Sequence, residues 1–373
     1  MLSKNVADEI DLVIRHLTEC LDNLLGGAPD STKCVNLNVD DLLLRYSIDL
    51  TFTCFYRQRD IINYDLSVED YHVSLIENAM NDQMHPVIPA SLSVPLLTPI
   101  IEFHVRRFHP LGELNKTMTR FIKQQTALSA EARETAIKAK KKDPTFNDST
   151  ITLKDGQIYK RNLVDTFIDS FLDGKISYTE YMHTSFFLIL ASVKTKTDSL
   201  SRLLYYLASD VEIQEKLRAA ILKDGHEAEY LGWCINEALR LDPPAPLGSS
   251  RIAERDIEIE GGVVPKGTFV LTPAHTIHRL PEYWGKDANQ FKPERWSQAH
   301  TFHPAQYIPF GGGTRACPGK EFALQDMRKV MQALLTRYKF ERCAKTSDTD
   351  LFCSPLMIYI IREMPIYLKI SKL

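Results

Sequence analysis

A cysteine in a glycine-rich loop is the residue of this sequence with the clearest chemical potential. The stretch "PFGGGTRACPGKEFAL", residues 309–324, carries three consecutive glycines, then Arg315 and Cys317, and then an apolar helical pattern. A cysteine just before a helix lies near unpaired backbone N–H groups and the positive end of the helix dipole, and both favour the thiolate over the thiol. Glycines permit tight turns and the close approach of a flat or bulky group, because they lack a Cβ. The pattern therefore predicts an anionic sulfur that a large ligand can approach.

Three interpretations of this loop are open on general grounds. The first is a dinucleotide fingerprint formed by Gly311, Gly313 and Ala316, but no βαβ pattern surrounds it and only about fifty residues follow. The second is a buried cysteine that serves packing alone, which is the usual role of a lone cysteine. The third makes Cys317 the thiolate ligand of an iron porphyrin, with Arg315 pairing with a propionate group.

The detailed pattern of the loop favours the third interpretation. The residues "FGGGTRACPG" satisfy FxxGxRxCxG at each specified position, which are Phe310, Gly313, Arg315, Cys317 and Gly319. Here the sequence resembles the cytochrome P-450 family of haem-thiolate monooxygenases, and in particular its eukaryotic microsomal members. The resemblance implies haem b, iron protoporphyrin IX, as the cofactor. It makes Cys317 the metal ligand and the other four residues part of the cofactor-binding loop.

Further residues carry the same resemblance. In "INEALRL", Glu237 and Arg240 lie three residues apart and therefore on one face of a helix, where they can pair. "FKPERW" supplies Arg295, which matches the arginine that completes the family's Glu-Arg-Arg network. The resemblance implies that these three residues support the site structurally, that Arg251 contacts a haem propionate, and that His278 is structural and binds no metal.

One segment departs from the family pattern. In the long helix predicted over residues 178–208, the family's AGxDTT segment falls on "ASVKTK", so Lys194 replaces the acid and Thr195 keeps the alcohol. The family assigns proton delivery to this acid and alcohol, which makes Thr195 the candidate catalytic residue. Asp198, nearly one turn further on, is a possible substitute carboxylate. The alternative is that Lys194 and Lys196 point into solvent or into a water channel.

The elements around these residues differ between the two parts of the chain. Residues 1 to about 240 carry mostly helical periodicity, such as the apolar stripe within "VADEIDLVIRHLTECLDNLL". Alternation and a Gly-Gly turn in "RDIEIEGGVV" predict a small sheet after the last of these helices. We expect a mainly α (α+β) fold, a single cytochrome P-450-like domain over residues 1–373. Against the family pattern the membrane anchor, first strands and early helices are missing, so a form truncated at the amino terminus is expected.

Composition limits the possible partners. The 373 residues are 44% hydrophobic and 25% charged, which is typical of a globular chain that buries a sizeable core. A net charge of -3 gives no electrostatic reason to expect nucleic acid as a partner. No apolar run approaches the roughly 20 residues that cross a bilayer. The resemblance therefore implies attachment to the endoplasmic reticulum membrane only through the missing amino-terminal segment.

The resemblance implies a reaction and leaves two alternatives. The expected activity inserts one oxygen atom from O2 into a small apolar organic substrate, with electrons from NADPH delivered by a partner flavoprotein reductase. The first alternative is a haem-thiolate isomerase or dehydratase that acts on a peroxide without a reductase. The second is a truncated, non-catalytic relative. Candidate substrate contacts are Phe186, Phe187 and Leu190, together with residues 245–250 and 351–357.

Overall fold

The computed structural model describes most of the chain, with internal gaps. The described residues are 4–26, 33–59, 62–67, 69–70, 72–74, 76, 110–248, 251–346, 352–353, 360–361 and 365–373. Within them the fold is mainly helical with small antiparallel sheets, so the predicted class is confirmed. Two compact units are distinguished: the first is Met1–His16 with Leu44–Val193, and the second is Leu17–Leu43 with Lys194–Leu373. The interpretation of residues 1–373 as a single domain stays a prediction.

Three helices contribute residues to both units, and they are α1 (Lys4–Leu24), α2 (Val39–Tyr56) and α8 (Tyr178–Ser209). The first unit also holds α6 (Pro110–Lys142), α7 (Leu163–Leu172), β2 (Thr150–Thr152) and β3 (Ile158–Lys160). Asn162 begins α7 because its side chain accepts from the Val164 N–H, while the carboxylate of Asp165 accepts from the Asn162 N–H at 2.6 Å. Helix α8, predicted over residues 178–208, ends at Ser209, one residue later than expected.

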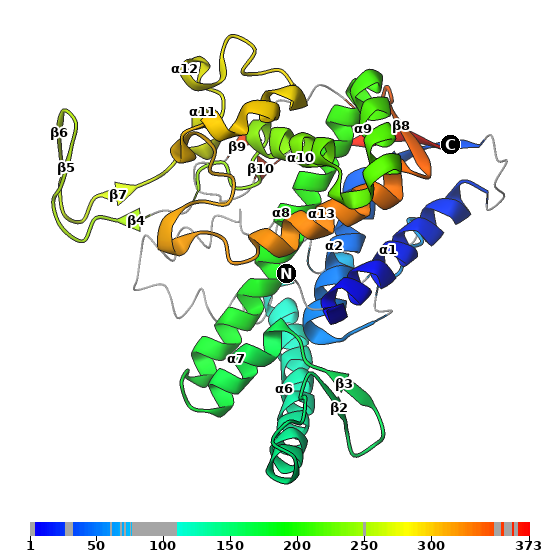
Figure 1. Cartoon of the computed structure of the whole chain (residues 1–373), viewed down its shortest axis with the longest axis vertical. Coiled ribbons are helices and arrows are strands. Elements are labelled where there is room, and N and C mark those ends of the chain that lie inside the picture. Colours follow the sequence, from blue (N-terminus) through cyan, green and yellow to red (C-terminus); the bar gives the residue numbers. More distant parts are fainter. Residues whose placement is uncertain are drawn as a thin grey trace. The chain divides into compact units, whose positions relative to one another are not determined.

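The second unit contains every residue predicted for the cofactor loop, for its structural support and for proton delivery. Its helices are α9 (Val211–Asp224), α10 (Glu229–Leu241), α11 (Ala274–Ile277), α12 (Pro281–Trp284) and α13 (Lys320–Leu335), with short 3-10 helices η3 (Gly225–Glu227), η4 (Pro293–Thr301), η5 (Pro304–Gln306) and η6 (Gly313–Arg315). Helices α9, α10 and α13 contact one another (Figure 1). Helix α10 ends at Leu241, as expected from the Pro243-Pro244 pair that follows it.

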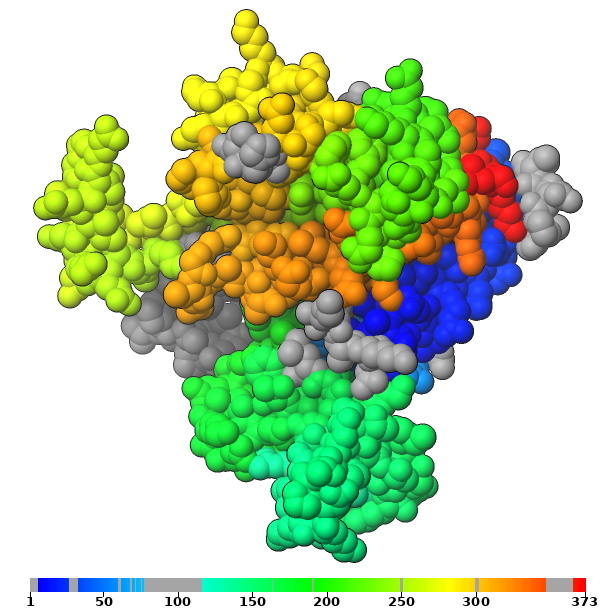
Figure 2. Space-filling model, in the orientation of Figure 1, coloured from blue at the N-terminus to red at the C-terminus, as the bar shows by residue number. Residues whose placement is uncertain are grey.

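The strands of the second unit form small antiparallel sheets. One has the order β1 (Cys34–Asn38), β11 (Tyr367–Lys372), β8 (Tyr338–Arg342), and the others pair β4 (Arg251–Ile252) with β7 (Phe269–Val270), β5 (Ile257–Ile259) with β6 (Gly262–Val264), and β9 (Phe352–Cys353) with β10 (Ile360–Ile361). The small sheet predicted from "RDIEIEGGVV" is confirmed by the pairing of Ile257 with Val264. Figure 2 shows this yellow-green hairpin standing out from the rest of its unit.

A buried glutamine joins three elements of the second unit. The Gln214 side chain, on α9, is fully buried. Its Nε2 donates to the carbonyls of Leu207 at 2.9 Å and Phe340 at 2.8 Å, and its Oε1 accepts from the Phe340 N–H at 3.1 Å. One amide therefore satisfies backbone groups at the end of α8 and in β8, where water does not reach.

We expect Gln214→Met to lower the free energy of unfolding by about 2–3 kcal/mol, because it leaves buried backbone groups of Leu207 and Phe340 without partners. Urea unfolding measures the change. The control is Gln157→Met, at an exposed loop position. Equal, small effects of both substitutions would contradict the role of Gln214.

Candidate functional site

The Cys317 loop is closed by its own backbone. The Cys317 N–H donates to the carbonyl of Phe310 at 2.9 Å, and the Gly311 N–H donates to the carbonyl of Ile308 at 3.0 Å. Gly311 and Gly313 have φ values of 69° and 68°, in the left-handed region that glycine adopts without strain. The two glycines thus allow the tight turns that bring Cys317 back against Phe310.

The sulfur lies on an exposed face of this loop. Cys317 and Arg315 are exposed, and a Cβ built on any of the three glycines 311–313 meets no atom of the described residues within 4 Å. The interpretation of Cys317 as a buried packing cysteine is therefore wrong. Cys234 on α10 is the contrasting case, because burial raises the pKa of its thiol well above the usual range. A thiol, a guanidinium and a face without Cβ atoms share the loop, which fits the approach of a large planar group.

Helix α13 holds the other end of the loop. It begins at Lys320, three residues after Cys317, and it buries an apolar stripe formed by Met327, Val330, Met331 and Leu334. On another face, Arg328 Nη1 donates to the carbonyl of His226 at 2.9 Å, which ties α13 to η3. The start of this helix is thereby fixed in the second unit.

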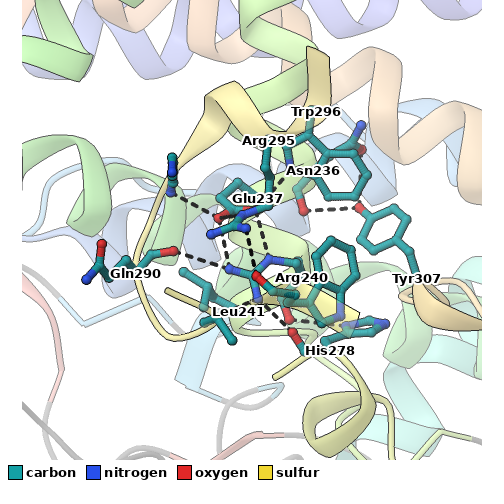
Figure 3. Close-up of polar contacts among 12 residues, drawn as sticks. Asn236, Glu237, Arg240, Leu241, His278, Gln290, Arg295, Trp296 and Tyr307 are labelled. Carbon is teal, nitrogen blue, oxygen red and sulfur yellow. Dashed lines mark hydrogen bonds and ion pairs between the residues drawn. The ribbon is translucent and has the colours of Figure 1, made fainter. Parts of the chain in front are cut away.

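The structure brings the predicted trio of Glu237, Arg240 and Arg295 together, and the side chains of Glu237 and Arg240 are fully buried (Figure 3). Glu237 Oε1 accepts from Arg240 Nη2 at 2.8 Å, from Arg295 Nε at 2.8 Å, and from the Lys292 N–H at 3.0 Å. Glu237 Oε2 accepts from Arg240 Nε at 2.8 Å and from the indole N–H of Trp296 at 3.0 Å. The carboxylate therefore has partners on both oxygens, as a buried charge requires.

Arg240 uses each of its five N–H groups. The Nε–H and one N–H of Nη2 donate to the Glu237 carboxylate. The second N–H of Nη2 donates to the Gln290 carbonyl at 3.2 Å. Nη1 donates to the carbonyls of His278 and Ala288, both at 2.7 Å. Since a guanidinium has five donors in a fixed plane, this one is saturated. It fixes three separate points of the irregular segment after α11 onto α10.

His278 links this network to the cysteine loop, and its side chain is fully buried. Its Nδ1 lies 3.1 Å from the Arg240 carbonyl, while its Nε2 accepts from the Ile308 N–H at 2.8 Å. These partners require the neutral ring with the proton on Nδ1. Burial lowers the pKa of His278 to about 4, which agrees with a neutral ring. The structural, non-ligand interpretation of His278 is consistent with this geometry.

A second link joins α10 to the same segment. The Tyr307 hydroxyl donates to Asn236, whose backbone and side-chain oxygens both lie 3.2 Å away, and the Tyr307 ring packs on Trp296 with centroids 4.5 Å apart. Sequence reasoning did not assign these roles. Their signal was weak, since Asn236 and Tyr307 are simply a polar and an aromatic residue beside recognised motifs.

Residues 191–196 of α8, which differ from the family pattern, do not all have the orientation that the sequence left open. Thr195 is half-buried, and Lys194 Nζ donates to Asp198 Oδ1 at 2.8 Å. Lys196 does not point into solvent, because its side chain is 4% exposed and its Nζ lies 3.7 Å from Asp326 Oδ2 on α13. That alternative is wrong for Lys196, because the helix turns its side chain toward α13. The missed signal was Asp326, an acid within the apolar stripe of α13.

The predicted propionate contact Arg251 and the predicted substrate contacts lie on several separate segments. Arg251 is an exposed residue of β4. Phe186 is half-buried and Phe187 exposed, both on α8 in the first unit. The side chain of Leu190 lies outside the described residues, as do positions 249–250 and most of 351–357. The substrate contacts proposed there stay predictions.

The comparison with known families decides the affiliation. The model of the family described as cytochrome P450 matches residues 2–370. The chain belongs to the cytochrome P450 family. This P450 chain therefore falls in a family of haem b oxidoreductases of the monooxygenase class, and the exposed thiol, the nearby guanidinium and the glycine face fit that cofactor.

Relatives of this P450 chain carry related names. It is 29% identical to "Cytochrome P450 3A12" of Canis lupus familiaris, over 96% of this chain and 69% of the relative. It is 28% identical to "Cytochrome P450 3A9" of Rattus norvegicus over 90% and 63%, and 29% identical to "Cytochrome P450 3A7" of Homo sapiens over 87% and 62%. The P450 chain thus spans about two thirds of their length. Similarity to these relatives agrees with the expected location of the chain at the endoplasmic reticulum membrane. Among the described residues, no helix has the length and apolar character to cross a bilayer.

Arg240→Lys is expected to lower the free energy of unfolding of the P450 chain by about 3–5 kcal/mol, because a lysine supplies three donors where the buried site uses five. Urea unfolding at neutral pH measures it. Arg337→Lys is the matched control, with a side chain that is 54% exposed. A small and equal effect at both positions would show that saturation of Arg240 does not stabilise the fold.

His278 predicts a pH dependence with a defined sign. Its folded-state pKa, about 4, lies below its usual value of 6.5, so the unfolded chain binds the proton first as the pH falls. The stabilisation is complete above 6.5 and is lost as the pH falls toward 4. His278→Gln keeps a donor and an acceptor without titrating. We expect the stability difference between wild type and His278→Gln to fall by about 3 kcal/mol across this window in urea unfolding. A difference that does not change with pH would contradict it.

Proposed function

We propose that this P450 chain is a haem-thiolate monooxygenase that inserts one oxygen atom from O2 into a small apolar organic substrate. NADPH supplies the electrons through a partner flavoprotein reductase, at the endoplasmic reticulum membrane. The observation that carries the proposal is the exposed Cys317 thiol on a loop fixed at one end by His278 and at the other by α13. Membership of the family supports the same reaction class.

The loop residues have distinct roles in the proposal. Cys317 binds the iron as thiolate, and the exposed guanidinium groups of Arg315 and Arg251 pair with propionates. Gly313 gives the loop its turn, and Phe310 and Gly319 flank the sulfur, with a Cβ at Gly319 placed 3.8 Å from Cys317 Sγ. When bound, a thiolate-ligated haem supplies the electron density that favours cleavage of the O–O bond.

Proton handling falls to the departing segment of α8. Thr195 offers the hydroxyl that accepts and passes on a proton. Asp198 supplies the carboxylate that the family has at position 194, and Lys194 Nζ holds it at 2.8 Å. The nearby acid is therefore kept, but it is one turn further along and carries a counter-charge.

One observation favours a second candidate function. Lys194 stands in place of the family acid and is engaged with Asp198, an arrangement that suits a haem-thiolate isomerase or dehydratase acting on a peroxide. Such an enzyme needs neither a reductase nor the acid and alcohol relay.

The absorption spectrum of the reduced protein under carbon monoxide tests the thiolate. We expect a strongly red-shifted Soret band in wild type that Cys317→Ala loses, because only a thiolate ligand produces it. Cys34→Ala removes another exposed cysteine and is expected to keep the band. Haem-free wild type, or the same spectrum from wild type and Cys317→Ala, would overturn the proposal in favour of a non-catalytic relative.

The reaction assay separates the two enzymes. We expect NADPH and O2 to be consumed in stoichiometric amounts with product when a microsomal reductase is added. Thr195→Val should lower that product yield at least several-fold, because the hydroxyl is lost. Turnover of a hydroperoxide without NADPH or reductase, unaffected by Thr195→Val, would instead support the isomerase or dehydratase.

A further inference from the structure

A buried ion pair crosses from α8 to α13 within the second unit. Lys196 Nζ lies 3.7 Å from Asp326 Oδ2, and the two side chains are 4% and 0% exposed. The same ammonium lies 5.6 Å from the centroid of the Phe322 ring, one turn before Asp326 on α13. Lys196 therefore contacts one face of α13 over a full turn.

This pair has an energetic cost that an apolar pair would not have. Two charges lose most of their hydration when they are buried, and their attraction offsets that loss only in part. Stability alone is therefore a weak reason for a lysine and an aspartate at these positions. Fixing one arrangement of two helices is a role that buried polar groups perform in other proteins.

The two residues lie next to the predicted chemistry. Asp326 is on the helix that begins three residues after Cys317, and Lys196 directly follows Thr195 in α8. A movement of α13 relative to α8 therefore changes the separation between the sulfur of Cys317 and the hydroxyl of Thr195. The Lys196–Asp326 pair is a direct connection between α8, which carries Thr195, and α13, which follows the Cys317 loop.

Helix α13 is held from nearly opposite sides. Asp326 and Arg328 are two residues apart, so their side chains leave the helix at about 200° to one another. Arg328 is bound to carbonyl oxygens of η3 and of Ala228 at 2.9 and 3.2 Å, and Asp326 is bound to Lys196. Two contacts on opposite sides resist rotation of α13 about its own axis.

We propose that Lys196 and Asp326 are positioning residues that set the distance and orientation of Cys317 relative to Thr195. The inference rests on the proposed haem-thiolate function, because only then do the sulfur and the hydroxyl serve one reaction. Neither residue contacts a substrate or cofactor in this role. The pair acts through α13.

The experiment compares four proteins: wild type, Lys196→Met, Asp326→Leu and the double variant. Each single change removes one of the two paired charges, whereas the double change replaces both charges with apolar side chains. We expect both single variants to lose most of the strongly red-shifted Soret band of the reduced carbon monoxide complex, and the double variant to recover it. Leu203→Ala is the control, since it empties a fully buried position on α8 in the same unit. It should destabilise the fold in urea and keep the band.

A second readout needs no haem. In the haem-free proteins, the rate of Cys317 alkylation by iodoacetamide is followed by mass spectrometry of its peptide. We expect the single variants to differ several-fold from wild type, and the double variant and Leu203→Ala to match it. Single variants that keep both the band and the wild-type rate would overturn the inference and leave the proposed function standing. A wild type without the band would overturn the proposed function, and the alkylation rates would then judge the positioning of Cys317 separately.

Discussion

The buried guanidinium of Arg240 is the constraint on which the second unit depends. A charge without solvent is tolerated only when each donor has a partner, and here the partners are Glu237 and the carbonyls of residues 278, 288 and 290. Those carbonyls belong to irregular chain with few ladder hydrogen bonds of its own. The Arg240 side chain therefore supplies hydrogen bonds that this segment would otherwise lack, and these bonds favour one backbone conformation of the segment.

The same constraint reaches the cysteine through one imidazole. Arg240 and His278 are bound reciprocally, because the arginine donates to the His278 carbonyl and Nδ1 of the ring bonds the Arg240 carbonyl. The opposite nitrogen accepts from Ile308, two residues before Phe310, whose carbonyl receives the Cys317 N–H. The loop is thus fixed through backbone groups, which leaves the Cys317 sulfur itself exposed. Its exposure is a consequence of how the loop is held.

The sequence predicted those parts that depend on spacing along one element. Apolar periodicity located α8 and α13, and a three-residue separation placed Glu237 beside Arg240. The carbonyl partners of Arg240 and the β1–β11 pairing could not be predicted from the sequence. Both bring together distant segments through backbone groups, which every residue has. The sequence left the orientation of Lys196 open for a related reason. Its burial depends on Asp326, 130 residues later, and only the acid in an apolar stripe hinted at it.

The two lysines on either side of Thr195 in the sequence are each paired with an acid, which changes what a lysine at position 194 means. Lys194 is matched by Asp198 on its own helix, and Lys196 is matched by Asp326 on α13. The order of the first pair, lysine before acid, is the less favourable one for the helix dipole, so helix stability does not explain it. The two pairs together carry no net charge, whereas the family pattern places one acid before the alcohol. In the proposed reaction, Asp198 has to exchange its contact with Lys194 before it supplies a proton to Thr195, so this ion pair would be part of the relay.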